Sequence, residues 1–244
     1  MITNSESGTN VHEVAQGIFR INTPISIPGA GAFSFNQYLI VDDQPLLFHT
    51  GPRRMFPLVQ EAISRVMPIE RLKYLGFSHV EADECGALNE LLAVAPTAVP
   101  VCSQVAAMTS VNDLAIRAPR ALNDGEELEL GSHRVRWFDT PHVPHGWECG
   151  LMMEMNTRTF LCGDLFTQGG SGALALTRDD ILGPSEEFRR PLDSYAHAPG
   201  TGAILERIAL ERPTTLAAMH GSAWQGDGAK LLRELSVALG RTFQ

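Results

Sequence analysis

The sequence predicts a layered α/β or α+β domain with mixed β-sheets. Stretches with strand character alternate with stretches whose apolar residues recur at helical spacing, and several strands come in pairs joined by short polar turns. This alternation is typical of domains in which helices cover the faces of sheets. The 244 residues contain neither an internal repeat nor an obvious linker. We therefore expect one domain over residues 11–244, preceded by a polar tail over residues 1–10.

The first half of the chain alternates strands with helices. Val11 to Ile21 predicts a strand pair, a Pro- and Gly-rich loop follows over 24–32, and apolar residues recur at helical spacing from Phe56 to Val66. On the same grounds we expect strands over 35–40, 45–49, 72–77 and 98–102, and helices around 88–92 and over 103–110. Each expected helix follows a strand, as in layered domains.

The second half contains two predicted hairpins and a long irregular stretch. Strands over 126–130 and 134–138 meet at a Gly-Ser turn, and strands over 150–155 and 159–162 meet at an Asn-Thr-Arg turn. Glycines and prolines make 168–200 a predicted loop region. A helix over 203–210, a strand over 214–219 and a helix over 229–239 complete the expected domain.

Composition narrows the function classes. The net charge is −9 and the basic residues are mostly scattered, which excludes nucleic acid as the expected partner. No apolar run approaches the ~20 residues of a membrane span, and the polar start lacks the features of a signal peptide. The four cysteines show no CxxC spacing. Reduced thiols in a cytoplasmic protein without a membrane segment are the resulting expectation.

A cluster of charged residues follows the predicted strand over 72–77. His79, Glu81 and Asp83 alternate, so on an extended segment they point to one side, and Glu84 comes next. Several carboxylates at the end of a buried strand repel each other and lose solvation, so they need a positive partner. A metal ion supplies that charge. The alternative is a solvated acidic loop that binds nothing.

Three further predicted strands end just before residues that commonly bind metals. His142 and His145 follow the strand over 134–138, Asp164 follows the strand over 159–162, and His220 follows the last strand. Strand ends on one edge of a sheet converge on one site. A lone histidine is usually structural, but this repeated placement favours a metal site.

These motifs resemble the metallo-β-lactamase superfamily, whose signature is an HxHxDH loop followed by a histidine, an aspartate and a last histidine. The resemblance covers nearly the whole chain. Glu81 in the middle position gives HxExD, the variant of the diiron branch, which contains the flavodiiron proteins and related oxygen-binding diiron proteins. The Gly163-Asp164 step, the Met219-His220-Gly221 step and the eighteen residues between His145 and Asp164 also match. The resemblance implies an αββα sandwich with two metals at one edge of the sheets.

The resemblance also implies a role for each ligand. His79, Glu81 and His145 would hold the first metal, Asp83 and His220 the second, and Asp164 would bridge them. A bridging carboxylate suits two divalent cations ~3.5–4 Å apart. A carboxylate at position 81 is a harder ligand than imidazole and favours iron or manganese over zinc. We therefore expect two iron ions, with zinc or manganese as alternatives.

Three positions depart from the superfamily pattern or leave a choice open. Glu84 stands where the motif has a histidine; it could bind the second metal or only open a helix, whose first turn favours carboxylates. His49 stands where most members have an aspartate, and we expect it to orient a ligand by hydrogen bonding. His145 is preferred over His142 as ligand because of its spacing to Asp164 and to the strand that begins near Gly150, and His142 would then support a ligand or line the pocket.

The functional expectation is a non-haem diiron protein that binds or senses O₂. Slow reduction of O₂ or NO would need an external electron donor, because the chain ends one helix after the last ligand and no flavin is expected in it. We also expect a homodimer and a separate redox or signalling partner. The alternatives are a dinuclear zinc hydrolase, against which Glu81 and Glu84 argue, and a non-catalytic module stabilised by metal. The sequence leaves open whether O₂, NO or peroxide is the ligand.

Overall fold

The computed structural model describes residues 1–29 and 31–242 and contains two seven-stranded sheets. The first sheet has the order β1-β2-β3-β4-β5-β6-β7 and the second has the order β12-β14-β13-β11-β10-β9-β8. The strands of the first sheet are β1 (Asn10–Ala15), β2 (Ile18–Ile27), β3 (Gly31–Ile40), β4 (Leu46–Phe48), β5 (Tyr74–Gly76), β6 (Val99–Ser103) and β7 (Arg120–Leu122). Those of the second are β8 (Glu127–Glu129), β9 (Arg134–Asp139), β10 (Gly150–Glu154), β11 (Thr159–Gly163), β12 (Leu176–Thr177), β13 (Thr215–Ala218) and β14 (Ala223–Gln225).

Both sheets are mixed. In the first sheet β1 to β4 pair antiparallel and β4 to β7 pair parallel. In the second sheet β8 to β11 pair antiparallel, and β13 pairs parallel with β11 and antiparallel with β14. Mixed sheets agree with the sequence, in which predicted hairpins and helical crossovers alternate.

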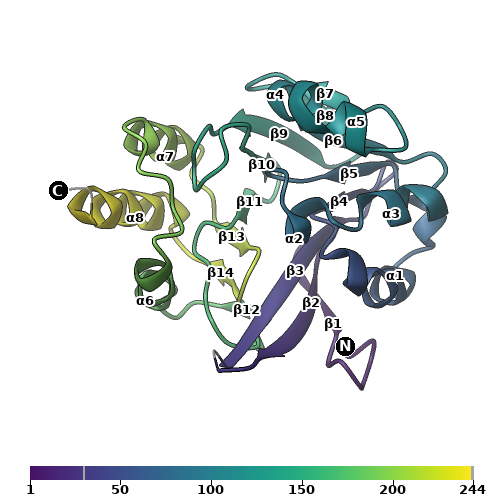
Figure 1. Ribbon diagram of the computed structural model, residues 1–244, viewed down its shortest axis with the longest axis horizontal. Helices are drawn as coiled ribbons and strands as arrows, with labels where there is room; N and C mark the ends of the chain where they lie inside the picture. Colours follow the sequence, from purple (N-terminus) through teal and green to yellow (C-terminus); the bar gives the residue numbers. More distant parts are fainter. Residues whose placement is uncertain (30, 243–244) are drawn as a thin grey trace.

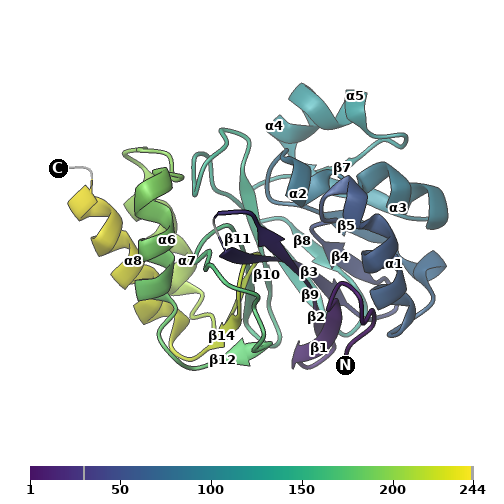
Figure 2. The ribbon, with the colours of Figure 1, turned by 60° about the horizontal axis from the view of Figure 1, so that its bottom comes forward.

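Helices cover the outer face of each sheet (Figure 1). The helices beside the first sheet are α1 (Phe56–Ser64), α2 (Ala82–Cys85), α3 (Leu88–Val94), α4 (Gln104–Ala106), a π-helical turn (Ala107–Val111) and α5 (Asn112–Leu114). Those beside the second are α6 (Leu182–Leu192), α7 (Thr201–Leu210) and α8 (Gly228–Thr242). Figure 2 shows α1 and α3 on one flank, α6 to α8 on the other, and the sheets between them.

Three apolar layers hold this arrangement together. Alternate side chains of one strand enter different layers, as the pleat requires: Met152 of β10 packs between the sheets, whereas Leu151 and Met153 face the helices. Trp137 and Phe48 also lie fully buried between the sheets. The expected αββα sandwich is therefore confirmed. The single-domain boundary at residue 11 stays a prediction.

Two local expectations are wrong. The stretch 24–32 is not all loop, because β2 continues to Ile27 and Pro24 pairs with Ser34 of β3. Beyond Asn22, β2 is no longer paired with β1, and such an edge position tolerates proline. The region 168–200 contains α6, whose prolines stand in its first and last turns, where they interrupt few helical hydrogen bonds. None of the described helices is both long and apolar enough to span a membrane.

The turn between β10 and β11 is built around the buried carboxylate of Glu154. It accepts hydrogen bonds from the main-chain N–H groups of Asn156 and Thr157, at 3.0 and 2.7 Å, and from the Thr157 hydroxyl. His133 Nδ1 lies 3.2 Å away. Burial opposes ionisation, but these partners outweigh it and lower the pKa of Glu154. The ionised carboxylate therefore fixes the hairpin that leads to Asp164.

We predict that Glu154→Gln lowers the free energy of unfolding by about 1–3 kcal/mol, because one acceptor oxygen becomes a donor facing N–H groups. Because the folded pKa is lowered, the advantage of native Glu154 is present above its ordinary pKa of 4.5 and is lost as the pH falls below it. Urea unfolding at pH 7 and pH 4 measures both effects. Glu129→Gln, at an exposed position of β8, is the control, and equal stability of the two variants at pH 7 would contradict the prediction.

Candidate metal centre

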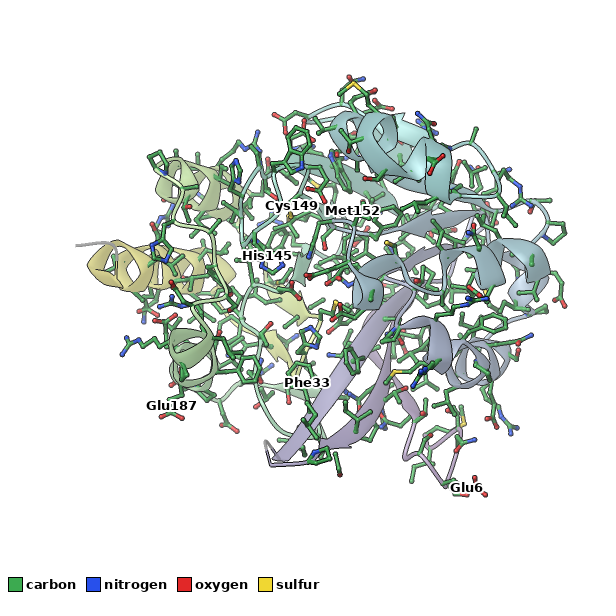
Figure 3. The ribbon with its side chains drawn as sticks, viewed as in Figure 1. Glu6, Phe33, His145, Cys149, Met152 and Glu187 are labelled. Atoms are coloured by element: carbon green, nitrogen blue, oxygen red, sulfur yellow. The ribbon has the colours of Figure 1, made fainter. Side chains whose placement is uncertain are left out.

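Potential metal ligands from both sheets meet at one edge of the sandwich. His79 and Glu81 follow β5, His145 lies between β9 and β10, Asp164 directly follows β11, and His220 follows β13. Figure 3 shows His145 between the two helical layers. The main-chain N–H of Gly150 donates to the Ser78 carbonyl at 2.9 Å and ties the loops of the two sheets together. The strand ends that converge on this site therefore belong to both sheets of the sandwich.

One set of atoms, here called the first donor group, consists of His79 Nε2, His145 Nε2, Glu81 Oε2 and Asp164 Oδ2. His79 Nε2 lies 3.1 Å from Glu81 Oε2 and 3.6 Å from Asp164 Oδ2. His145 Nε2 lies 3.4 Å from Glu81 Oε2 and 3.3 Å from Asp164 Oδ2. The four residues offer ligand atoms that all lie within 4.8 Å of one another. This spacing fits coordination of a single ion.

The second donor group consists of His220 Nε2, Asp83 Oδ2 and Asp164 Oδ1. His220 Nε2 lies 3.5 Å from Asp83 Oδ2 and 3.2 Å from Asp164 Oδ1. Asp164 therefore directs one carboxylate oxygen to each group, and its side chain is only 12% exposed. A carboxylate placed in this way can link two metal ions.

The other ring nitrogen of each histidine is held by a neighbour. His145 Nδ1 lies 2.9 Å from the Ser194 carbonyl, and His220 Nδ1 lies 2.9 Å from the Ser34 carbonyl. A carbonyl only accepts, so both Nδ1 atoms carry the proton, and Nε2 of the neutral ring is left with its lone pair. Such hydrogen bonds fix the tautomer and orientation of metal-binding histidines.

A short chain of hydrogen bonds supports His79. Ser78 Oγ lies 2.9 Å from His79 Nδ1 and 3.0 Å from Nε2 of the buried His49. Gly163 allows this packing: its φ is +54°, and a Cβ there would lie 3.2 Å from Ser78 Oγ. His49 thus contacts the donor groups through Ser78, which is the arrangement a supporting role requires.

Two observations show that this donor set fits divalent metal ions. The Nε2 atoms of His79 and His145 lie 2.9 Å apart, so a cation, either a proton or a metal ion, has to lie beside their lone pairs. Both carboxylate oxygens of Glu84 are buried and have no hydrogen-bond partner within the described part of the chain. Imidazole nitrogens combined with several carboxylates are ligands that iron and manganese accept in proteins. The described residues could hold two such ions.

Electrostatics inside the cluster couple the imidazoles to the carboxylates. Burial alone would lower the pKa of His79, but contacts with Cys149 and Glu81 and the charges of Glu84 and Asp164 raise it to about 12. Burial alone would raise the pKa of Asp164, but His220, His79 and His145 lower it well below its usual range. The cluster therefore binds a proton on His79 that a metal ion has to replace.

The structure brings together six of the predicted residues: His79, Glu81, Asp83, His145, Asp164 and His220. His142 is different, because it is exposed and no described hydrogen bond or ion pair joins its ring to the donor groups. The choice of His145 rather than His142 as a ligand stays a prediction. Glu84 points inward and is completely buried.

Apart from His49, the residues that support the ligands were not identified from the sequence. Tyr195 donates its hydroxyl to the Asp164 carbonyl at 3.0 Å and accepts from the Phe166 N–H at 3.2 Å. The Phe33 ring stacks on His220 with centroids 4.5 Å apart. Ser34 and Ser194 act through main-chain carbonyls, which any residue type could supply, so the sequence carries no signal for them. Among these supporting residues, Ser78 is the one that the sequence could have indicated, because it directly precedes His79 of the motif.

We predict that metal binding releases protons. A histidine ligand has to be neutral, so a divalent metal ion displaces the proton held by His79. At pH 7, about one proton should therefore be released for every two metal ions bound. Affinity should therefore rise with pH, about tenfold per pH unit for each proton released. Calorimetric titration with Mn²⁺ in two buffers of different ionisation enthalpy measures the proton count.

His142→Ala serves as the matched control, since this exposed histidine should leave the proton count and affinity unchanged. His79→Ala should weaken binding and reduce proton release. Identical binding enthalpies in both buffers for the native protein would contradict the prediction.

Comparison with solved structures supports the architecture. The rubredoxin oxygen:oxidoreductase of Desulfovibrio gigas has a TM-score of 0.79 at 18% identity, covering 94% of this chain and 61% of that one. The metal-soaked Flv1 flavodiiron core of Synechocystis sp. has a TM-score of 0.78 at 19% identity, covering 95% of this chain and 60% of that one. At these identities the likeness establishes the fold alone.

Sequence relatives point in the same direction. The anaerobic nitric oxide reductase flavorubredoxin of Salmonella arizonae is 23% identical over 214 residues, which cover 82% of this chain and 43% of the relative. The matched region spans between 19% and 50% of the length of these curated relatives.

A family profile described as ODP family beta lactamase matches residues 33–187, which is more than half of the chain. The match contains every donor residue except His220. The metallo-β-lactamase resemblance is therefore confirmed, and this chain belongs to the ODP family of β-lactamase-like proteins.

Proposed function

We propose that this protein is a non-haem diiron protein that binds or senses O₂. The observation that carries the proposal is the shared carboxylate of Asp164, with one oxygen 3.2 Å from His220 Nε2 and the other 3.3 Å from His145 Nε2. His79, Glu81 and His145 would hold the first iron, and Asp83 and His220 the second. Two ferrous ions held in this way would supply a binding site and reducing electrons for a small diatomic molecule.

The choice of iron rests on the ligands. Glu81, Asp83 and Asp164 contribute carboxylates to the two donor groups, and the first group contains two imidazoles rather than three. Zinc hydrolase sites in proteins rely more on neutral imidazoles, whereas carboxylate-rich sites favour iron or manganese. The dinuclear zinc hydrolase is therefore the less favoured alternative.

The relatives support a diatomic ligand. One relative is named as a nitric oxide reductase, and one structural neighbour is named as an oxygen oxidoreductase. A cavity of about 450 Å³ adjoins Glu81 and is walled partly by Phe77, Val80 and Leu88, so an apolar ligand would find an apolar approach beside the donor groups. We therefore propose O₂ as the preferred ligand of the site and NO as the second candidate.

Further parts of the proposal concern partners. Net reduction of O₂ or NO consumes electrons, so turnover would need a redox partner, while sensing would need a signalling partner. A homodimeric state, a cytoplasmic location and the absence of flavin from this chain belong to the same proposal.

We predict that protein purified without oxygen contains two irons per chain and develops a new near-ultraviolet or visible band when air is admitted. Metal analysis and absorbance spectroscopy measure these outcomes, and NO added in a parallel sample ranks the two ligands. Bound zinc with no response to either gas, together with ester hydrolysis, would contradict the proposal.

A variant of the shared ligand tests the same site. Asp164→Ala should weaken binding of both irons on the order of 100-fold or more, because loss of a residue that only supports a ligand already costs about 10–100-fold and Asp164 would bind both ions directly. Asp113→Ala, an exposed carboxylate of α5, is the control and should retain both irons. Two tightly bound irons in Asp164→Ala would show that Asp164 does not link them.

A further inference from the structure

Glu84 is a buried carboxylate without a conventional partner. It lies in the four-residue helix α2, and its side chain is 0% exposed. Neither carboxylate oxygen has a hydrogen-bond partner among the residues that the structure describes, and no described main-chain N–H donates to its side chain. A carboxylate that served only the first turn of a helix would accept such a bond or face water. The structure therefore argues against the explanation that Glu84 only stabilises the first turn of a helix.

The main chain holds Glu84 with its side chain toward the donor groups. The N–H of Thr50 donates to the Glu84 carbonyl at 2.7 Å, and Thr50 is itself fully buried. Glu84 Oε2 lies 3.9 Å from His79 Nε2. Glu81, Asp83 and Glu84 offer ligand atoms within 4.8 Å of one another. The side chain thus lies beside both donor groups.

The cost of this placement requires compensation. An ionised carboxylate taken out of water costs several kcal/mol unless an opposite charge or hydrogen bonds offset that cost. The contact with His79 is longer than a hydrogen bond, and Asp83 and Asp164 add negative charge nearby. A metal ion in the second donor group would offset the charge.

Ligand numbers also favour the second group. Four residues contribute to the first donor group, whereas Asp83, His220 and Asp164 alone contribute to the second. Both groups would then have four protein ligands if Glu84 joins the second. This inference rests on the two-metal site of the proposed function.

We propose that Glu84 is a direct ligand of the second metal ion, alongside Asp83, His220 and Asp164. The site then contains four carboxylates, whose four negative charges balance two divalent cations. A histidine at this position would leave one positive charge unbalanced. Glu84 should therefore stabilise the oxidised metal pair relative to a Glu84→His variant, because added negative charge favours the higher oxidation state.

The test compares the native protein with Glu84→Gln, using Mn²⁺ alone as a probe that does not depend on activity. Competition with a chelator should show two ions bound by the native chain. In Glu84→Gln the first affinity should be unchanged and the second should fall about 10–100-fold. Unchanged affinity for both ions would overturn the proposal, as would equal weakening of both.

A folding control accompanies this measurement. Thermal unfolding after metal removal should show Glu84→Gln about as stable as the native protein, since glutamine fills the same space and no described hydrogen bond to the carboxylate is lost. Glu154→Gln replaces another buried carboxylate and should lower stability while it retains both ions. Loss of the second ion combined with misfolding of Glu84→Gln would count against a ligand role.

A redox titration of the iron-loaded protein provides the second readout. Glu84→His should keep two irons and titrate at a higher midpoint potential than the native protein. An equal or lower potential would contradict the charge argument. If the native chain binds fewer than two ions, the proposed function itself fails; if it binds two and Glu84→Gln binds two equally well, only the role of Glu84 fails.

Discussion

The carboxylate of Asp164 is the interaction on which the site depends. Its two oxygens face imidazoles that come from different loops, and its burial makes these contacts strong because little water screens them. The carbonyl of the same residue accepts the Tyr195 hydroxyl, and Ser194, the residue before Tyr195, accepts from His145. One short segment after α6 therefore positions the shared carboxylate and a histidine of the first donor group.

The sandwich explains why ligands so distant in the sequence meet. Loops of the first sheet provide His79, Glu81 and Asp83, and loops of the second provide the remaining donors. The Gly150–Ser78 hydrogen bond joins the two sets, and the N–H of Asn36 donates to the Met219 carbonyl beside His220. The apolar layer between the sheets fixes their spacing, so the positions of the loops follow from packing rather than from the ligands themselves.

Much of this arrangement is predictable from local sequence. Alternation in the motif from His79 to Asp83 and the placement of Asp164 and His220 after apolar strands point to one site, because strand ends converge. The helix α6 is not predictable in the same way, since its prolines resemble loop signals until their places in the first and last turns are known. The carbonyl contacts from Ser34 and Ser194 carry no residue-type signal at all.

Glu84 shows where sequence and structure complement each other. The sequence identifies a departure from the superfamily motif but leaves two explanations for it. Burial of both carboxylate oxygens without hydrogen bonds removes one of them. Position 84, like position 81, is therefore a place where this chain has a carboxylate in place of a histidine of the superfamily motif, which changes the charge of its metal centre.

The most direct test of the account is a crystal structure of iron-loaded protein with anomalous diffraction collected at the iron edge. Two iron peaks are expected, with one oxygen of Asp164 bound to each, His79, Glu81 and His145 around the first, and Asp83, Glu84 and His220 around the second. A single peak, or two peaks that Asp164 does not connect, would contradict it.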